Sequence, residues 1–174
     1  MKINKFKILL FLLFFTGTIH AQVSEYEFKA AFIERFTRFI EWPDSIQSDT
    51  FNIVVIGKTP LQSTMDELFS NIKIKKHNVK LTYTKDTNDL KYANLVFISK
   101  SAKKRIDKIL KLTNKYPILT ISDTKGFATK GVHINMYEDN NYIRYEINQE
   151  AIEKSNLKVS SLLLASAKIV KTDD

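Results

Sequence analysis

Residues 121–148 combine a strand end, a glycine-marked loop and an alternating segment, and they constrain the fold more than any other stretch. The sequence contains only four glycines, and two of them, Gly126 and Gly131, lie in this loop. Because glycine takes positive φ at little steric cost, we expect tight backbone turns at both positions. After Gly131, apolar and polar residues alternate on both sides of a polar turn at residues 138–141. This pattern predicts a half-buried β-hairpin.

Apolar strands and amphipathic helices alternate along the rest of the chain. Apolar runs predict strands at residues 51–56, 79–83, 95–98 and 117–121. Helical periodicity predicts helices after residues 24, 59 and 101, a short helix after residue 148, and a final helix that is apolar over residues 162–169. Repeated βα units of this kind favour one α/β domain. In it, a largely parallel central sheet is flanked by helices, and the antiparallel hairpin is added near one edge.

The first predicted helix is rich in phenylalanine. A broad apolar stripe that includes Phe28, Phe32 and Phe39 should pack on the core, whereas Ile33 lies off this stripe. Ile33 would therefore leave apolar surface exposed unless a partner covers it. Trp42, the only tryptophan, stands directly before a proline that ends the helix. It either caps the core beneath the helix or anchors an interface with another protein.

One face of the predicted hairpin is polar. Its side chains include His133, Asn135, Arg144 and Glu146. His133 and Asn135 should share a face, within reach of Arg144 or Glu146 across the hairpin. Such a cluster either binds a small polar ligand or forms an exposed polar sheet surface, and the second interpretation is the simpler one.

The first 21 residues have the layout of a secretory signal peptide, with lysines, an apolar run at residues 8–15 and small or polar residues up to Ala21. The run is shorter than the roughly 20 residues that span a bilayer, although an uncleaved anchor is the alternative. Cleavage near Ala21 would leave residues 22–174 as one exported domain. This loss of three lysines and no acidic residue lowers the formal charge from +8 to +5.

A modest basic excess suits anionic lipid or acidic partner surfaces as well as nucleic acid. The local lysine clusters at residues 73–76 and 100–105 are typical of solvated faces. The absence of cysteine excludes disulfides, so the folded state must depend on its core.

No catalytic or cofactor-binding motif is complete. Gly57 and Lys58, between a strand and a helix, match part of a phosphate-binding loop, but Asn52 stands where that loop needs another glycine. Asp123, at a strand end, either caps a turn or contributes to a ligand site. The two histidines after residue 21 have no partner at metal-ligand spacing, and no serine lies in a strained nucleophile turn. We therefore expect no enzymatic activity, no metal and no cofactor.

Several segments recur in a fixed order in one family of exported proteins. They read Lys-Ala-Ala-Phe at 29–32, Glu-Trp-Pro at 41–43, Ile-Ser-Asp at 121–123, Gly-Phe-Ala at 126–128 and Glu-Ile-Asn at 146–148. Together they span nearly the whole chain after residue 21 and resemble the YfiR-like family. The chain departs from many relatives at Lys130, where they have a second glycine, and in its lack of disulfide-forming cysteines.

The resemblance implies a periplasmic regulator. The best-known YfiR-like proteins hold an inner-membrane diguanylate cyclase inactive by binding its periplasmic sensory domain, and so set cyclic-di-GMP levels and biofilm behaviour. By this resemblance we expect the chain to bind and repress or modulate a membrane signalling protein, either a diguanylate cyclase or a sensor histidine kinase. Homodimer formation is an option, membrane contact should occur only through the partner, and no nucleic acid should bind. The candidate partner- or ligand-binding residues are Phe39, Trp42, Asp123, Phe127, His133, Asn135, Arg144 and Glu146.

Two alternatives stay open. One is a periplasmic protein that binds a small ligand in a cleft near Asp123, Phe127 and Asn135. The other is an unrecognised hydrolase that uses Asp123, His133 and Glu146.

Overall fold

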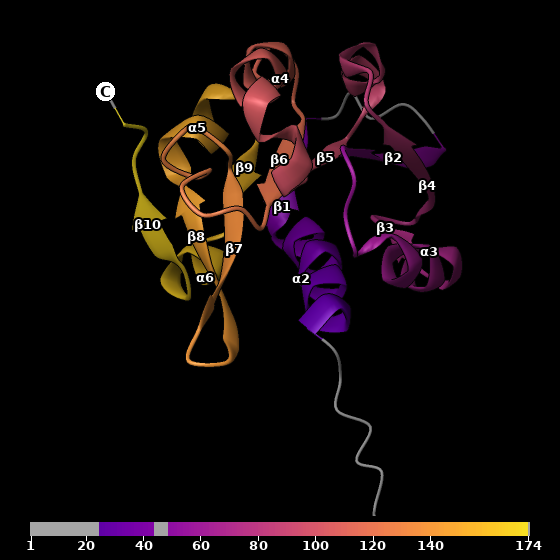
Figure 1. Ribbon diagram of the computed structural model, residues 1–174, viewed down its shortest axis with the longest axis horizontal. Helices are drawn as coiled ribbons and strands as arrows, with labels where there is room; N and C mark the ends of the chain where they lie inside the picture. The colour runs from indigo at the N-terminus through magenta and orange to yellow at the C-terminus, as the bar shows by residue number, and fades with distance from the viewer. Residues whose placement is uncertain (1–24, 44–48, 174) are drawn as a thin grey trace, which may run out of the picture.

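A mostly parallel eight-stranded sheet forms the centre of the computed structural model, which describes residues 25–43 and 49–173 (Figure 1). Its strands are β2 (Thr50–Ile56), β3 (Lys73–Ile74), β4 (His77–Thr84), β5 (Leu95–Ile98), β6 (Leu119–Ser122), β7 (Ile134–Asp139), β8 (Tyr142–Asn148) and β10 (Lys168–Val170). They lie in the order β10-β8-β7-β6-β5-β2-β4-β3. The β3–β4 and β7–β8 pairs are antiparallel, and the other neighbours pair in parallel. The predicted α/β fold with an added hairpin is confirmed.

Helices cover both faces of this sheet. Those on one face are α2 (Glu25–Phe39), α3 (Gln62–Asn71) and α6 (Ser161–Ala165). The other face carries α4 (Ile106–Thr113) and the 3₁₀ helices η2 (Thr87–Tyr92) and η3 (Lys100–Arg105). A fifth α-helix, α5 (Gln149–Lys154), follows β8, and a separate two-stranded sheet joins β1 (Ile40–Glu41) to β9 (Lys158–Val159). None of the described helices is long and apolar enough to cross a membrane, and the expected signal segment lies outside the described residues.

Two apolar cores lie on opposite faces of the sheet. Because side chains alternate along a strand, Ile53 and Val55 of β2 point toward α2, whereas Val54 and Ile56 point toward α4. All four are buried, which explains why β2 reads as a continuous apolar run. The strand predicted at residues 51–56 is confirmed.

The inward face of α2 differs from the predicted one. Ala30, Ile33 and Phe36 are buried against the sheet, and Ile33 has no exposed surface. Phe28, which was expected to face the core, is 49% exposed, and Phe32 is only partly buried. Phe36 belongs to the predicted stripe and is buried as expected, but the prediction was wrong for Phe28 and Ile33, because α2 carries two adjacent apolar stripes at helical spacing. Periodicity alone does not say which stripe faces the sheet.

The C-terminal segment also differs from its prediction. Ser160 caps α6 by accepting a hydrogen bond from the Leu162 N–H, but the helix ends at Ala165. Residues 168–170 then form β10, which extends the sheet by pairing in parallel with β8. The β-branched Ile169 and Val170 favour an extended strand. Because residues 162–169 are apolar nearly throughout, their periodicity did not show where the helix ends and the strand begins.

The loop after β2 packs closely on the loop after β5. Gly57 has a φ of +94°, and a Cβ there would lie 2.3 Å from Ser99 Oγ and 2.5 Å from Ser101 Oγ. Ser101 Oγ accepts a hydrogen bond from the Lys58 N–H at 2.7 Å and lies 3.1 Å from the Lys58 carbonyl. These contacts join the carboxyl ends of two neighbouring parallel strands, where open α/β sheets often bind ligands. The polar groups of this crevice are therefore paired with one another.

We predict that Gly57→Ala lowers the free energy of unfolding by about 3 kcal/mol. The alanine would be strained by the left-handed backbone, and its methyl group would clash with Ser99 and Ser101. Gly126→Ala is the matched control. Its φ of +81° is also left-handed, but no atom lies within 4 Å of the added Cβ, so the expected loss is only about 1 kcal/mol. Urea unfolding of both variants tests the difference, and equal losses would contradict the close contact at Gly57.

Candidate functional site

A long groove separates α2 from the β7–β8 hairpin. Its volume is about 830 Å³. The side chains that line it are Glu25, Phe28, Ala31, Phe32, Arg35, Glu138, Asn141, Tyr142 and Ile143. The helix supplies one wall and the outer part of the hairpin the other. The groove is thus lined by a helix, by two paired strands and by the turn that joins them.

A second, smaller groove continues along α2 toward α6. Its volume is about 380 Å³, and Phe32 and Arg35 line both grooves. The remaining residues of the smaller groove are Phe36, Phe39, Tyr145, Leu162, Leu163 and Ser166. Because the two grooves share these side chains, we treat them as one surface, the α2 groove. It contains Phe39, one of the predicted binding residues.

Large apolar side chains in the α2 groove remain open to solvent. Phe28 is 49% exposed, Tyr142 69% and Leu162 71%. Below them, the Tyr145 ring lies 5.9 Å from Phe32 and 4.9 Å from Phe36, so the floor is aromatic. Contiguous exposed apolar surface of this kind marks interaction sites in soluble proteins. Aromatic side chains at such sites supply much of the binding energy.

The hairpin wall is held by its turn and by an ion pair. Asn140 and Asn141 adopt positive φ values of 50° and 64°, which suit a tight two-residue turn. Arg144 Nε lies 2.8 Å from Asp139 Oδ2 across the two strands. Arg144, predicted to join the polar cluster with His133, instead stabilises the part of the hairpin that lines the groove.

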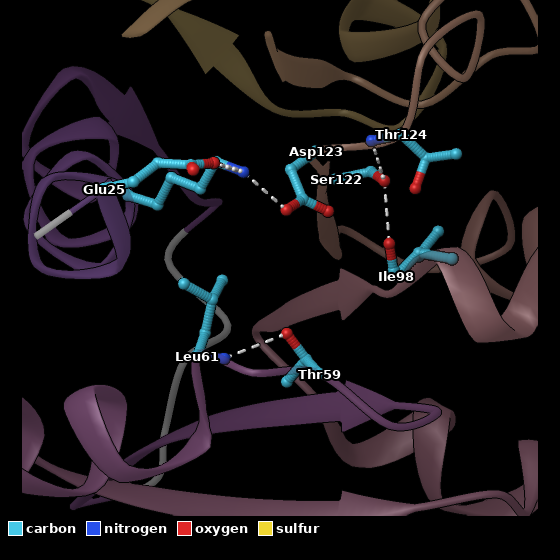
Figure 2. A network of polar contacts seen from close by, with 8 residues as sticks. Glu25, Thr59, Leu61, Ile98, Ser122, Asp123 and Thr124 are labelled. Carbon is cyan, nitrogen blue, oxygen red and sulfur yellow. Dashed lines mark hydrogen bonds and ion pairs between the residues drawn. The ribbon is translucent and has the colours of Figure 1, made fainter. Parts of the chain in front are cut away.

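An ion-pair cluster ties the first turns of α2 to the sheet. Lys29 Nζ lies 2.6 Å from Glu25 Oε1 and 2.9 Å from Asp123 Oδ2, and Figure 2 labels the two carboxylates. The Lys29 side chain is only 10% exposed. Burial alone would lower the pKa of Lys29, but its hydrogen bonds to Glu25 and Asp123 outweigh that effect, and the pKa rises above its ordinary value. Lys29 therefore stays charged and fixes α2 over the end of β6.

Asp123 thus pairs with a helix and does not cap its own turn. The neighbouring Ser122 has that role, because its Oγ accepts a hydrogen bond from the Thr124 N–H at 3.1 Å (Figure 2). Ser122 also donates to the Ile98 carbonyl at 2.7 Å, which links β6 to β5. Our interpretation of Asp123 as a turn-capping residue was therefore wrong, because the Ser122 hydroxyl takes the turn's hydrogen bond and the Asp123 carboxylate pairs with Lys29.

His133 is buried where β7 begins, which contradicts the exposed polar face that we expected. Its Nδ1 accepts a hydrogen bond from the Thr120 N–H at 3.2 Å, so the neutral ring carries its proton on Nε2. Burial lowers the pKa of His133 to about 4, and the Ala151 carbonyl offsets only part of this lowering. No hydrogen bond of good geometry reaches Nε2 from the described residues. His133 is a structural link between β6 and β7.

Asn135 and Glu146 meet across the hairpin, as predicted, but beneath other chain segments. Asn135 is fully buried and donates a hydrogen bond from Nδ2 to Glu146 Oε1 at 3.3 Å. The loop after β6 and the C-terminal segment are joined next to this pair. Asn148 Nδ2 donates to the Ala128 carbonyl and to Thr172 Oγ1, both at 2.9 Å. Alternation correctly placed these side chains on one face, but it contains no information about the segments that cover it.

Phe127 and Trp42 are mainly core residues. Phe127 is 1% exposed and packs under α4. Trp42 packs edge-on against Phe51, with 5.2 Å between ring centroids, and its indole N–H donates to the Asn94 carbonyl at 3.2 Å. It is partly buried against the core that contains α2, which matches the first of its two interpretations. Neither residue lines the α2 groove.

A family comparison identifies the chain's relatives. The model of a family described as YfiR/HmsC-like matches residues 26–168, most of the chain. The chain belongs to the YfiR/HmsC-like family. At the level of the family, these proteins are periplasmic regulators of cyclic-di-GMP signalling without a catalytic role. No match was found among curated proteins.

Solved structures of two bacterial proteins share the fold of this YfiR/HmsC-like chain. A conserved domain protein from Vibrio cholerae O1 biovar El Tor has a TM-score of 0.57 at 11% identity, over 85% of this chain and 60% of that one. The ABC domain in complex with L-Trp from Streptococcus pneumonia has a TM-score of 0.57 at 9% identity, over 83% and 60%. The chain therefore spans 60% of the length of each. At these identities the likeness shows the fold alone.

Sequence analysis missed three residues that define the site in this YfiR/HmsC-like protein. Phe28 was expected in the core, Lys29 was noted only as part of a family segment, and Tyr142 was not named, although each has a detectable signal. Lys29 lies four residues after Glu25 and four before Ile33, so it borders the buried stripe. Phe28 and Tyr142 are aromatic residues next to polar ones, which is only a weak indication of an exposed binding residue. Their shared role becomes visible only in the structure, where α2 and the hairpin lie side by side. Within the described residues, no group of three His, Asp or Glu side chains could hold a metal ion.

We predict that stability falls as the pH decreases from about 6.5 to about 4. The unfolded His133 ring binds a proton near its ordinary pKa of 6.5, whereas the folded ring does so only near 4. The unfolded state therefore binds more protons in this window. The stabilisation is complete above pH 6.5 and about 3 kcal/mol is lost by pH 4. Urea unfolding across this range should show the free energy of unfolding fall as the pH decreases. An equal fall in the His133→Asn variant would show that other groups cause it.

We also predict that Lys29→Met lowers the free energy of unfolding by about 2 kcal/mol, because it leaves the partly buried Asp123 carboxylate without a cation. Lys154→Met is the matched control. Lys154 pairs with Glu150 on the surface, with a 70% exposed side chain, so the expected loss is below about 0.5 kcal/mol. Chemical unfolding of both variants compares the two ion pairs. Similar small losses would show that Lys29 does not fix α2.

Proposed function

We propose that this protein binds the extracytoplasmic sensory domain of an inner-membrane signalling protein, either a diguanylate cyclase or a histidine kinase, and represses or modulates it. The family assignment supports the regulatory role and the periplasmic location. The observation that carries the binding proposal is the α2 groove, in which Phe28, Tyr142 and Leu162 expose about half or more of their surfaces. A protein partner that covers these side chains would remove a large apolar area from water.

The shape and charge of the groove suit a protein segment of mixed character. Glu25, Arg35 and Glu138 lie along the walls of the larger groove, between apolar side chains. A helix or hairpin with an apolar ridge and charges of both signs would match this arrangement. Repression would follow if the protein binds one conformation of the sensory domain more tightly than the other. The signal that releases the partner would then act by lowering this difference in affinity.

A second candidate function is the binding of a small ligand, and the size of the larger groove favours it. Its volume of about 830 Å³ falls in the usual range of small-molecule sites, and its lining is mainly apolar with a few charged groups. Neither part of the groove includes Asp123, Phe127 or Asn135, the residues first considered for a ligand. A ligand bound here would raise the melting temperature, and the increase would grow with the logarithm of the ligand concentration above the Kd.

We predict that the tagged protein, exported to its native periplasm, recovers one membrane protein with a cytoplasmic cyclase or kinase domain from detergent-solubilised membranes. Phe28→Ser and Tyr142→Ser should each reduce this recovery by about tenfold or more, since a buried aromatic anchor contributes roughly 1–2 kcal/mol or more. Mass spectrometry identifies and quantifies the partner.

Ile169→Ser is the matched control for this experiment. Ile169 is 48% exposed, almost the same as Phe28, but lies on β10 and does not line the α2 groove. Recovery with this variant should equal that of the unmodified protein. Equal recovery with all variants would reject the groove as the binding surface. If the unmodified protein recovers no partner, the regulator proposal fails, and ligand binding becomes the stronger candidate.

A further inference from the structure

The basic excess of the chain is concentrated in one short segment. Residues 100–115 contain seven Lys or Arg residues and a single Asp, which gives a formal charge of +6. Residues 22–174 together carry +5, so the rest of that span carries −1. The segment comprises η3, α4 and the turn that follows α4. The cationic character of the protein is therefore local.

The lysines of this segment are exposed and unpaired. Lys108 and Lys111 form a stripe on the exposed side of α4, which Lys104 of η3 and Lys115 of the following turn continue at its two ends. Lys100 and Lys103 extend the stripe over η3, and we call these six residues the lysine face. None of the six forms an ion pair with any described residue.

Two exposed cations on other helices show the pairing that the lysine face lacks. On α2, Arg38 pairs with Glu34 four residues earlier, and on α5, Lys154 pairs with Glu150 at the same spacing. Asp107 lies at that spacing from Lys103 and Lys111 but forms an ion pair with neither. The lysine face therefore presents a net positive field to its surroundings.

Two exposed tyrosines border the lysine face. Tyr92, at the end of η2, is 69% exposed, and Tyr116, after α4, is 43% exposed. Lys91 Nζ lies 4.7 Å from the centre of the Tyr92 ring. Tyrosine combines an apolar ring with a polar tip and is enriched where proteins meet the headgroup region of a bilayer.

We propose that the lysine face binds directly to an anionic phospholipid surface. Lysine ammonium groups act as point charges without fixed geometry, which suits a dense but unordered layer of lipid phosphates. The one arginine of the segment, Arg105, already donates to the Lys85 carbonyl. The apolar side of α4 is buried in the core, as Ile106 and Ile109 show, so the contact is peripheral and electrostatic. The protein thus reaches the membrane by itself, in addition to any contact through a partner.

The position of the lysine face is compatible with partner binding. α4 packs on one face of the sheet and α2 on the other. In Figure 1, α4 and the tip of the β7–β8 hairpin lie at opposite ends of the view. A membrane under α4 would therefore leave the α2 groove open on the far side. Membrane binding would keep the protein close to membrane partners without covering that groove.

The test is flotation of the protein, purified after export, with lipid vesicles. Vesicles that contain phosphatidylglycerol should bind it, vesicles of phosphatidylcholine alone should not, and binding should weaken as salt increases. Lys→Gln changes at Lys104, Lys108, Lys111 and Lys115 together should lower the partition coefficient at least about a hundredfold, since each lysine contributes a factor of about five. Two double variants, Lys104 with Lys108 and Lys111 with Lys115, give intermediate losses and guard against misfolding of the quadruple variant.

The matched control changes four other exposed lysines to Gln: Lys73, Lys76, Lys80 and Lys158. Its net charge equals that of the first quadruple variant, but its vesicle binding should stay within about threefold of the unmodified protein. Equal losses in both quadruple variants would overturn the proposal, because net charge and not the lysine face would then determine binding. Binding to polyglutamate without binding to anionic vesicles would also overturn it, in favour of an acidic protein partner.

Discussion

The packing of α2 across the sheet determines which surfaces of this protein are buried and which are available. The helix has two adjacent apolar stripes, and only one of them can face the core. Ile33 and Phe36 take that position, and the buried Lys29, held between Glu25 and Asp123, fixes the helix there. The second stripe then faces the hairpin and α6, where it lines the α2 groove. The site is thus a direct consequence of how one helix is oriented.

Chain segments that are far apart in sequence determine whether the polar hairpin residues are buried or exposed. His133 and Asn135 are buried because the loop after β6 and the C-terminal segment cover them, with Asn148 joining the two. Burial on this side keeps His133 neutral and links β6 to β7. The polar cluster therefore contributes to the structure of the sheet, and the opposite side of the hairpin faces the groove.

Local patterns in the sequence were sufficient for most of the fold. The apolar run of β2, the hairpin and the short helix after Asn148 all depend on neighbours within a few residues, so periodicity and turn chemistry predicted them. The two-residue strands β1 and β9 and the strand β10 are stabilised by pairing with distant segments, which local patterns do not contain. The site was predicted only in part for the same reason. Phe39 was among the predicted binding residues, but Phe28 and Tyr142 line one groove only because α2 and the hairpin, which are distant in sequence, pack side by side.

The most direct test of the central claim is site-specific photocrosslinking in the native periplasm. A photoreactive phenylalanine analogue placed at Phe28 or Tyr142 would report which molecule touches the α2 groove, and one placed at Ile169 would serve as the reference position. The account predicts that both groove positions crosslink to one membrane protein with a cytoplasmic cyclase or kinase domain, and that Ile169 does not. Crosslinks to that protein from Ile169 alone, or no crosslink from either groove position, would contradict it.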